Sequence, residues 1–157
     1  MHWYKGFTLL HLLETIKIEN TVNSEEIRFP IQYINRPNSN FRGYSGTLFS
    51  GKIHIGQKIK ILPININSCI SRIAKFDQDL ETAEVGGAIT IVLNDEIDIN
   101  RGDFFVNINS FLKPSQEAII DVVWMIDSVL EIGNSYIIKL SGKKRVFILK
   151  KFYLKLT

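Results

Sequence analysis

Hydrophobic residues near the N-terminus recur at spacings of three and four positions. This spacing places five apolar side chains on one side of a helix. Thr8 precedes the apolar positions and can accept a backbone hydrogen bond as the N-cap residue. The pattern predicts a short amphipathic helix over residues 7–16, which needs a neighbouring surface because short helices are marginal alone. The apolar positions are Leu9, Leu10, Leu12, Leu13 and Ile16.

The period changes from a helical one to two residues after a polar stretch at 20–26. Phe29, Ile31 and Tyr33 alternate with other side chains and predict a strand with these three residues on one face. Proline lacks a backbone donor and restricts the residue before it. We therefore expect the strand to break into a loop at Arg36-Pro37-Asn38.

Further short strands follow, and glycines separate them. Alternating isoleucines predict strands on both sides of a turn at Gly56-Gln57, and later strands are expected at 69–76, 88–93 and 103–106. The run AITIVL at 88–93 is almost wholly apolar and is expected to be buried on both faces. About six strands at intervals of roughly 8–12 residues favour a small closed barrel, because closure removes exposed edges.

A second β unit is predicted after Lys113-Pro114. Its three apolar strand candidates are residues 118–126, 135–140 and 145–149. Three strands seldom form a barrel, so this unit is expected to be incomplete.

Composition supports a packed core but no polyanion-binding barrel. Of 157 residues, 45% are hydrophobic and 22% are charged, and the net charge is +3. Six basic residues and no acidic ones lie in 143–157, whereas the other 142 residues carry 13 basic and 16 acidic side chains. Because the alternating Phe and Lys residues of the tail also suit an edge strand, nucleic acid is not an expected partner.

The lack of a recognisable targeting signal and the single cysteine make the cytoplasm the expected location. The chain has no apolar run of the roughly 20 residues that cross a membrane, and its first residues do not resemble a secretory signal. Cys69 is the single cysteine, which excludes an internal disulfide. A membrane partner is therefore not expected either.

Motifs for nucleotide or metal chemistry are missing from the sequence. It contains no phosphate-binding G-x-x-x-x-G-K-[ST] loop, no G-x-G-x-x-G and no H-E-x-x-H. His2, His11 and His54 are too scattered for a ligand set, and Cys69 is interpreted as a buried packing thiol rather than a nucleophile. No catalytic, nucleotide-binding or metal-binding residue and no cofactor is assigned to this chain.

Two polar groups remain as candidates. Carboxylates at 95, 96 and 98 could bind a cation, but the intervening isoleucines favour a solvated turn between strands. Arg36, Asn38 and Arg42 could hold a phosphate or a partner's carboxylate by charge-assisted hydrogen bonds. The favoured alternative is that these three residues brace the barrel against a neighbouring domain.

Several strings, taken in order, resemble the large, GTP-binding subunit of bacterial sulfate adenylyltransferase. WYKGFTLLHLLETI resembles the join after that family's GTPase domain, and RFPIQYINRPNSNFRGYSGT resembles the start of its second domain, a translation-factor-type barrel. DEIDINRGD and VVWM resemble the rest of that barrel and the opening of the third domain. The likeness covers roughly residues 2–142 and fades beyond Gly142.

The resemblance implies an organisation in three parts. Residues 1–22 would be the end of the GTPase domain, 23–111 the translation-factor barrel and 112–157 a partial third domain. The expected fold class is thus all-β: a translation-factor-type six-stranded barrel, preceded by a short amphipathic helix and followed by an incomplete second barrel. The GTPase domain and the end of the third domain are expected to be absent.

The resemblance also implies a function. In the intact family, GTP and magnesium serve a subunit that couples GTP hydrolysis to synthesis of adenosine 5′-phosphosulfate from ATP and sulfate, for sulfate assimilation and cysteine biosynthesis. A separate small subunit, the heterodimer partner, performs the adenylyl transfer. This chain is expected to supply scaffold and docking domains only and to be inactive alone. The alternative is a free-standing translation-factor-like barrel that binds RNA or protein.

Overall fold

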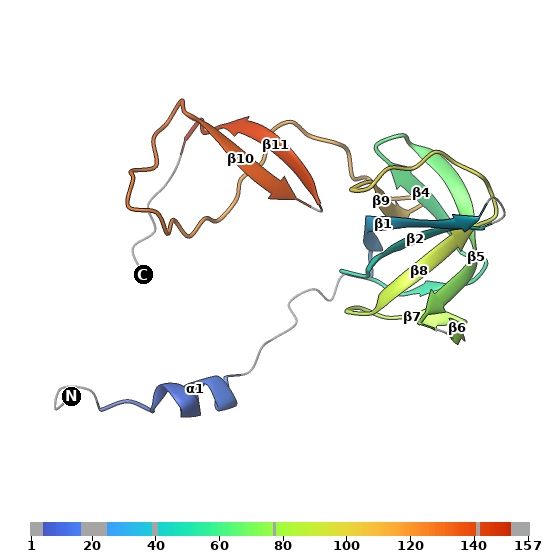
Figure 1. Cartoon of the computed structure of the whole chain (residues 1–157), viewed down its shortest axis with the longest axis horizontal. Coiled ribbons are helices and arrows are strands. Elements are labelled where there is room, and N and C mark those ends of the chain that lie inside the picture. The colour runs from blue at the N-terminus through green and yellow to red at the C-terminus, as the bar shows by residue number, and fades with distance from the viewer. Residues whose placement is uncertain (1–4, 17–24, 39–40, 77, 141, 152–157) are drawn as a thin grey trace.

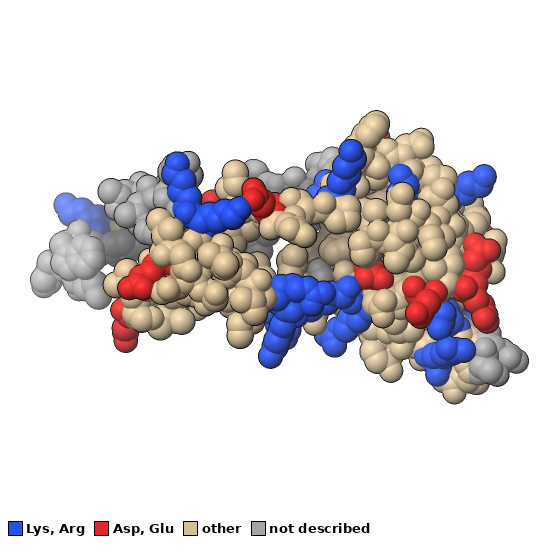
Figure 2. Space-filling model, turned by 90° about the horizontal axis from the view of Figure 1, so that it is seen from above, with Lys and Arg blue, Asp and Glu red and all other residues tan. Residues whose placement is uncertain are grey.

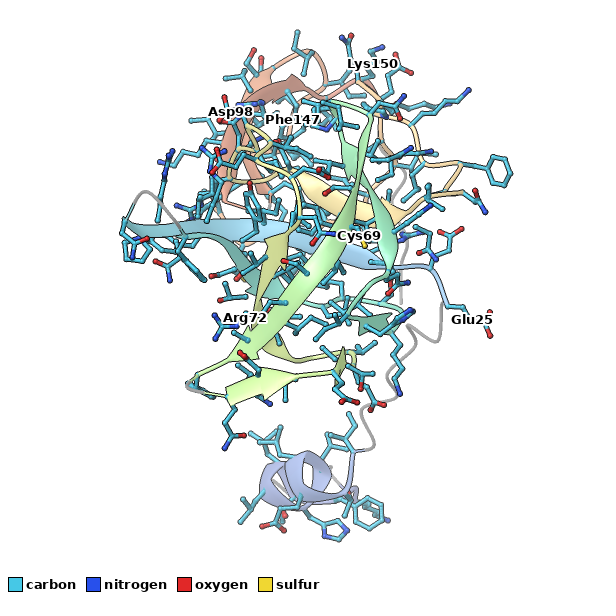
Figure 3. The ribbon with its side chains drawn as sticks, turned by 90° about the vertical axis from the view of Figure 1, so that its right-hand side faces the viewer. Glu25, Cys69, Arg72, Asp98, Phe147 and Lys150 are labelled. Atoms are coloured by element: carbon cyan, nitrogen blue, oxygen red, sulfur yellow. The ribbon has the colours of Figure 1, made fainter. Side chains whose placement is uncertain are left out.

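The computed structural model describes residues 5–16, 25–38, 41–76, 78–140 and 142–151. Its helix α1 (Leu9–Thr15) has Thr8 as N-cap, whose Oγ1 accepts a hydrogen bond from the His11 backbone N–H at 3.3 Å. The predicted helix is therefore confirmed. Its apolar side chains remain exposed, and α1 stands apart from the strands in Figures 1 and 3.

Short strands between Arg28 and Asn107 form a β-barrel (Figure 1). Six of them follow one another around the barrel in the order β4, β9, β1, β2, β8 and β5, and β5 also pairs with β4. All neighbouring strands are antiparallel. The strands are β1 (Arg28–Asn38), β2 (Phe41–Thr47), β4 (Lys58–Leu62), β5 (Ile66–Lys75), β8 (Ala88–Leu93) and β9 (Phe104–Asn107), accompanied by the shorter β3 (Ile53–His54), β6 (Gln78–Leu80) and β7 (Thr82–Ala83).

Two long strands link the halves of the barrel. The first residues of β1 pair with β9 and its later residues pair with β2. Likewise β5 pairs first with β4 and then with β8. The barrel is thus two sheets that share β1 and β5, an arrangement that lets strongly twisted strands wrap around one core.

Aromatic and β-branched side chains fill the space between the two sheets. Phe29 and Phe105 are fully buried with ring centroids 5.7 Å apart, and Tyr44 meets Phe105 edge to face at 5.6 Å. Isoleucines from β1, β4, β5 and β8 complete the cluster. The all-β class and the six-stranded barrel are confirmed, and the side chains leave its interior packed.

The expected break in the first strand is wrong, because β1 continues through Arg36 and Pro37 to Asn38. Register shifts lie between Ile31 and Tyr33 and between Asn35 and Asn38. Bulges of this kind accommodate a residue that cannot join the ladder, as Pro37 cannot. The first shift also reverses the facing of side chains, so Tyr33 is exposed although Ile31 is buried.

The prediction that residues 88–93 are buried on both faces is also wrong. In β8, Ile89, Ile91 and Leu93 are buried, whereas Ala88 is exposed and Val92 is half-buried. A barrel wall has one inner and one outer side, so an apolar sequence can still expose alternate residues. Because some outward-facing positions of β8 are also apolar, its sequence does not show the alternation of apolar and polar residues that marks a strand with one buried face.

In the described residues after the barrel, β10 (Ser135–Leu140) and β11 (Lys143–Ile148) form a hairpin. The strand predicted at 118–126 is wrong, since these residues have no strand structure and all of them are exposed. Trp124 packs edge to face on Tyr136 and its Nε1 donates to the Ser128 carbonyl at 2.7 Å, which holds the segment locally. The domain limits at 22 and 111 stay predictions. In the described part of the chain, no helix is long and apolar enough to span a bilayer.

Candidate functional site

The three residues predicted as contacts lie on the β1–β2 hairpin. Arg36 and Asn38 are exposed near the end of β1, and Asn38 pairs in register with Phe41 at the start of β2. Arg42 follows on β2 and is half-buried. The hairpin therefore brings the three residues to one end of the two strands, while the Arg42 side chain is used within the barrel.

Arg42 and Tyr44 converge on one backbone acceptor. The Arg42 guanidinium donates to the carbonyl oxygen of Ile97 at 2.8 Å, and the Tyr44 hydroxyl donates to the same oxygen at 2.9 Å. Both side chains come from one face of β2, since residues two apart share a face. They tie β2 to the segment between β8 and β9, which carries the acidic residues.

Burial raises the pKa of Tyr44 above its ordinary value of 10.0. The nearby Arg42 guanidinium opposes this by favouring the phenolate, and the carboxylates of Asp98 and Glu96 add a smaller upward effect on the pKa. Tyr44 therefore remains a neutral hydrogen-bond donor at physiological pH.

The acidic segment is anchored by its isoleucines and solvated at its carboxylates. Ile99 is buried and Ile97 packs against the core, whereas Asp95, Glu96 and Asp98 are exposed. Figure 3 labels Asp98 at the end of the barrel farther from α1. Asp95 accepts a hydrogen bond from Ser68 Oγ at 2.7 Å. Within the described residues, no three His, Cys, Asp or Glu side chains gather as a metal site.

Cys69 is not the buried packing thiol that the sequence suggested. Ser68 and Ile70 on either side of it in β5 are buried, so Cys69 faces the outer side and is half-buried. Its Sγ lies 3.1 Å from the carbonyl oxygen of Gly56, to which it can donate. His11 and His54 lie on separate elements, α1 and β3, and His2 lies outside the described residues.

Asp103, which no sequence motif predicted as a site residue, is the one charged side chain among the buried residues that the structure describes. Its Oδ2 accepts from the Asn100 backbone N–H at 2.8 Å, and its Oδ1 lies 2.9 Å from Lys143 Nζ. The signal was present as Arg101-Gly102-Asp103, where an acidic residue follows a turn glycine. Its burial depends on tertiary contacts that spacing does not reveal.

These polar contacts hold separate parts of the barrel together. They join Arg42, Tyr44 and Asp103 to backbone groups of the barrel, Ser68 to Asp95, and Lys143 to Asp103. Such contacts fix a loop, a turn and a strand against one core.

Sequence comparison connects most of this chain with one kind of protein. Sulfate adenylyltransferase subunit 1 of Buchnera aphidicola subsp. Acyrthosiphon pisum (strain Tuc7) is 69% identical over 149 residues, which is 94% of this chain and 32% of that protein. The Salmonella arizonae protein of the same name is 56% identical over 144 residues, 92% of this chain and 30% of the relative. The chain thus spans about a third of these relatives. No protein-family model matches it.

Structural comparison identifies the fold. Sup35 complexed with GDP superposes with a TM-score of 0.60 at 16% identity, covering 92% of this chain and 36% of Sup35. Translation elongation factor SelB from Methanococcus maripaludis in its apo form gives 0.53 at 19% identity, covering 65% and 23%. The predicted translation-factor type of barrel is therefore confirmed.

Proposed function

The chain is related along 94% of its length to sulfate adenylyltransferase subunit 1, as its sequence led us to expect, and from this relationship we propose that it is a scaffold portion of such a subunit. In the family it resembles, GTP hydrolysis is coupled to synthesis of adenosine 5′-phosphosulfate from ATP and sulfate. The barrel and the hairpin would hold the other parts of the subunit in position. GTP and magnesium would bind to other parts of the enzyme, and the adenylyl transfer would also take place outside this chain.

The observation that carries this proposal is the continuous relationship across barrel and hairpin, combined with a packed interior. Phe29, Tyr44 and Phe105 occupy the centre of the barrel, so a ligand has no room inside without displacing them. The barrel's contribution must then come from its outer surface and its loops. Docking of other domains or subunits is a role that such a surface can perform.

The name subunit 1 of the relatives implies a second subunit, and we place the small subunit of sulfate adenylyltransferase as the partner. Arg36 and Asn38 are exposed on the β1–β2 hairpin, where a neighbouring domain or subunit could contact them. Arg42 contributes by holding β2 against the acidic segment.

The experiment mixes the full chain with the small subunit of sulfate adenylyltransferase from the same Buchnera strain as the relative. We expect the two proteins to co-elute in size-exclusion chromatography and to form no adenosine 5′-phosphosulfate without an intact large subunit, which serves as the positive control. Fluorescent GTP should show no micromolar binding to the chain alone. Micromolar GTP binding would overturn the scaffold assignment, and a salt-sensitive RNA mobility shift would favour the alternative RNA-binding module.

A further inference from the structure

Two glycine-containing turns, about forty positions apart in the sequence, meet where the hairpin adjoins the barrel. One is Arg101-Gly102-Asp103, just before β9, and the other is the β10–β11 turn, whose described part is Gly142-Lys143. Both glycines have a positive φ, 82° at Gly102 and 81° at Gly142. In Figure 2, basic side chains lie at the junction of the two lobes.

Each turn receives a basic side chain from the other. A Cβ added to Gly102 would lie 2.7 Å from the side-chain carbons of Lys143, and a Cβ added to Gly142 would lie 2.5 Å from Nε of Arg101. These distances are shorter than van der Waals contact, so the absence of side chains at both glycines lets the turns approach closely. The contact is reciprocal, because each glycine accommodates the basic side chain of the other turn.

An ion pair lies at the centre of this contact. The Lys143 ammonium is 2.9 Å from Asp103 Oδ1, and the Asp103 side chain is only 3% exposed. The Lys52–Glu84 pair on the barrel surface, by comparison, has side chains 59% and 76% exposed. Solvent screens such a surface pair, but a buried carboxylate that loses its counter-ion is strongly destabilised.

The barrel side of the contact is rigidly held. The Asp103 carbonyl oxygen accepts from the Ile31 N–H at 2.8 Å, and the Gly102 N–H donates to the Ile31 carbonyl at 2.6 Å. Asp103 Oδ2 is also occupied, by the Asn100 N–H. The carboxylate is therefore oriented by β1 and its own turn, with Oδ1 directed to Lys143.

We propose that Lys143 and Asp103, together with the Arg101–Gly142 contact, form a clasp that fixes the orientation of the β10–β11 unit on the barrel. The barrel supplies a preorganised acidic socket, and the hairpin supplies the lysine that enters it. This inference does not rest on the proposed function. It states that the Lys143–Asp103 pair determines how the hairpin is placed relative to the barrel.

The test measures the distance between the units in the full chain. Spin labels at His54→Cys on the barrel and Ser135→Cys on the hairpin, both exposed positions, are introduced with Cys69→Ser and read by pulsed electron resonance. Lys143→Met keeps the aliphatic stem over Gly102 and removes the charge. We expect a narrow distance distribution in the parent and a clearly broader one in Lys143→Met.

Lys144→Met is the matched control, because Lys144 is exposed and pairs with Lys139 on the hairpin. The distribution should stay narrow in this variant. An unchanged distribution in Lys143→Met, or equal broadening in Lys144→Met, would overturn the clasp.

A second measurement separates the ion pair from general stability. Asp103→Asn keeps an acceptor for the Asn100 N–H and removes the buried charge. Adding Asp103→Asn to Lys143→Met should therefore raise the urea midpoint above that of Lys143→Met alone. A double variant that loses the sum of the two single effects would contradict a coupled pair.

Discussion

Arg42 and Tyr44 donate hydrogen bonds to the same acceptor, the carbonyl oxygen of Ile97, at 2.8 and 2.9 Å. The acceptor lies in the segment joining β8 to β9, and the donors lie on β2, more than fifty residues earlier. Ile97 itself packs against the core. One carbonyl thus links a strand, a connecting segment and the hydrophobic cluster.

Replacing Arg42 by methionine should lower the free energy of unfolding by about 1.5–3 kcal/mol, the usual range for a hydrogen bond from a charged donor. Arg36→Met is the control, because Arg36 is exposed near the end of β1. The control should change stability by less than about 0.5 kcal/mol. Urea unfolding measures both, and equal losses in the two variants would contradict an internal role for Arg42.

Tyr44→Phe should cost about 0.5–1.5 kcal/mol at neutral pH, because Ile97 loses one neutral donor but keeps the Arg42 bond. Tyr33→Phe, at a tyrosine that is 63% exposed, is the control and should be close to neutral. Thermal unfolding in parallel distinguishes them. A cost at Tyr33 matching that at Tyr44 would argue against the specific bond.

The raised pKa of Tyr44 predicts a pH dependence of stability. The folded state holds the phenolic proton more tightly than the unfolded state, whose tyrosine titrates near the ordinary value of 10.0. Stability from this group is thus fully present below pH 10 and declines as pH rises towards the folded pKa. The difference in unfolding free energy between parent and Tyr44→Phe, followed from pH 8 upward, should shrink above pH 10. A difference that grows there would contradict the direction of the shift.

Periodicity predicted the helix and most barrel strands because these features depend on side chains a few positions apart. Thr8 and the leucines of α1 specify their helix locally, as Ile59 and Ile61 specify β4. The bulges of β1 were not predicted, since they depend on how Pro37 meets the ladder of β2. The apolar run at 118–126 has hydrophobic character without a pairing strand, and composition alone does not supply a partner.

Long-range polar contacts were the least predictable part of the candidate site. Arg42 was expected to contact another domain or a ligand, but its fixed bond is to Ile97 in the same barrel. Lys143 was interpreted as part of a solvated basic tail, yet it reaches the buried Asp103. In both cases the partner lies at least forty positions away, and its approach is decided by strand order and turn geometry.

Phe105→Ala should lower the free energy of unfolding by about 3–5 kcal/mol, because the ring is fully buried between Phe29 and Tyr44. Phe111→Ala is the control, since that ring is 92% exposed, and it should cost less than about 0.5 kcal/mol. Denaturant midpoints and m-values measure the difference. Similar midpoints for the two variants would mean that the aromatic cluster does not stabilise the barrel.

Gly46→Ala tests how closely β1 and β2 approach. A Cβ at Gly46 would lie 2.3 Å from the carbonyl oxygen of Pro30, a backbone atom that cannot move aside without disturbing β1. We expect a loss of about 2 kcal/mol or more from this overpacking. Gly56→Ala is the matched comparison, because its φ is 80° but nothing lies within 4 Å of the added Cβ. That change should cost only the left-handed backbone penalty, about 1–2 kcal/mol. Backbone amide exchange would locate the effect: in Gly46→Ala, the amides paired between β1 and β2 should lose protection, whereas in Gly56→Ala they should keep it. Unchanged protection across this strand pair in Gly46→Ala would show that the added Cβ is accommodated without disturbing the pairing of β1 and β2.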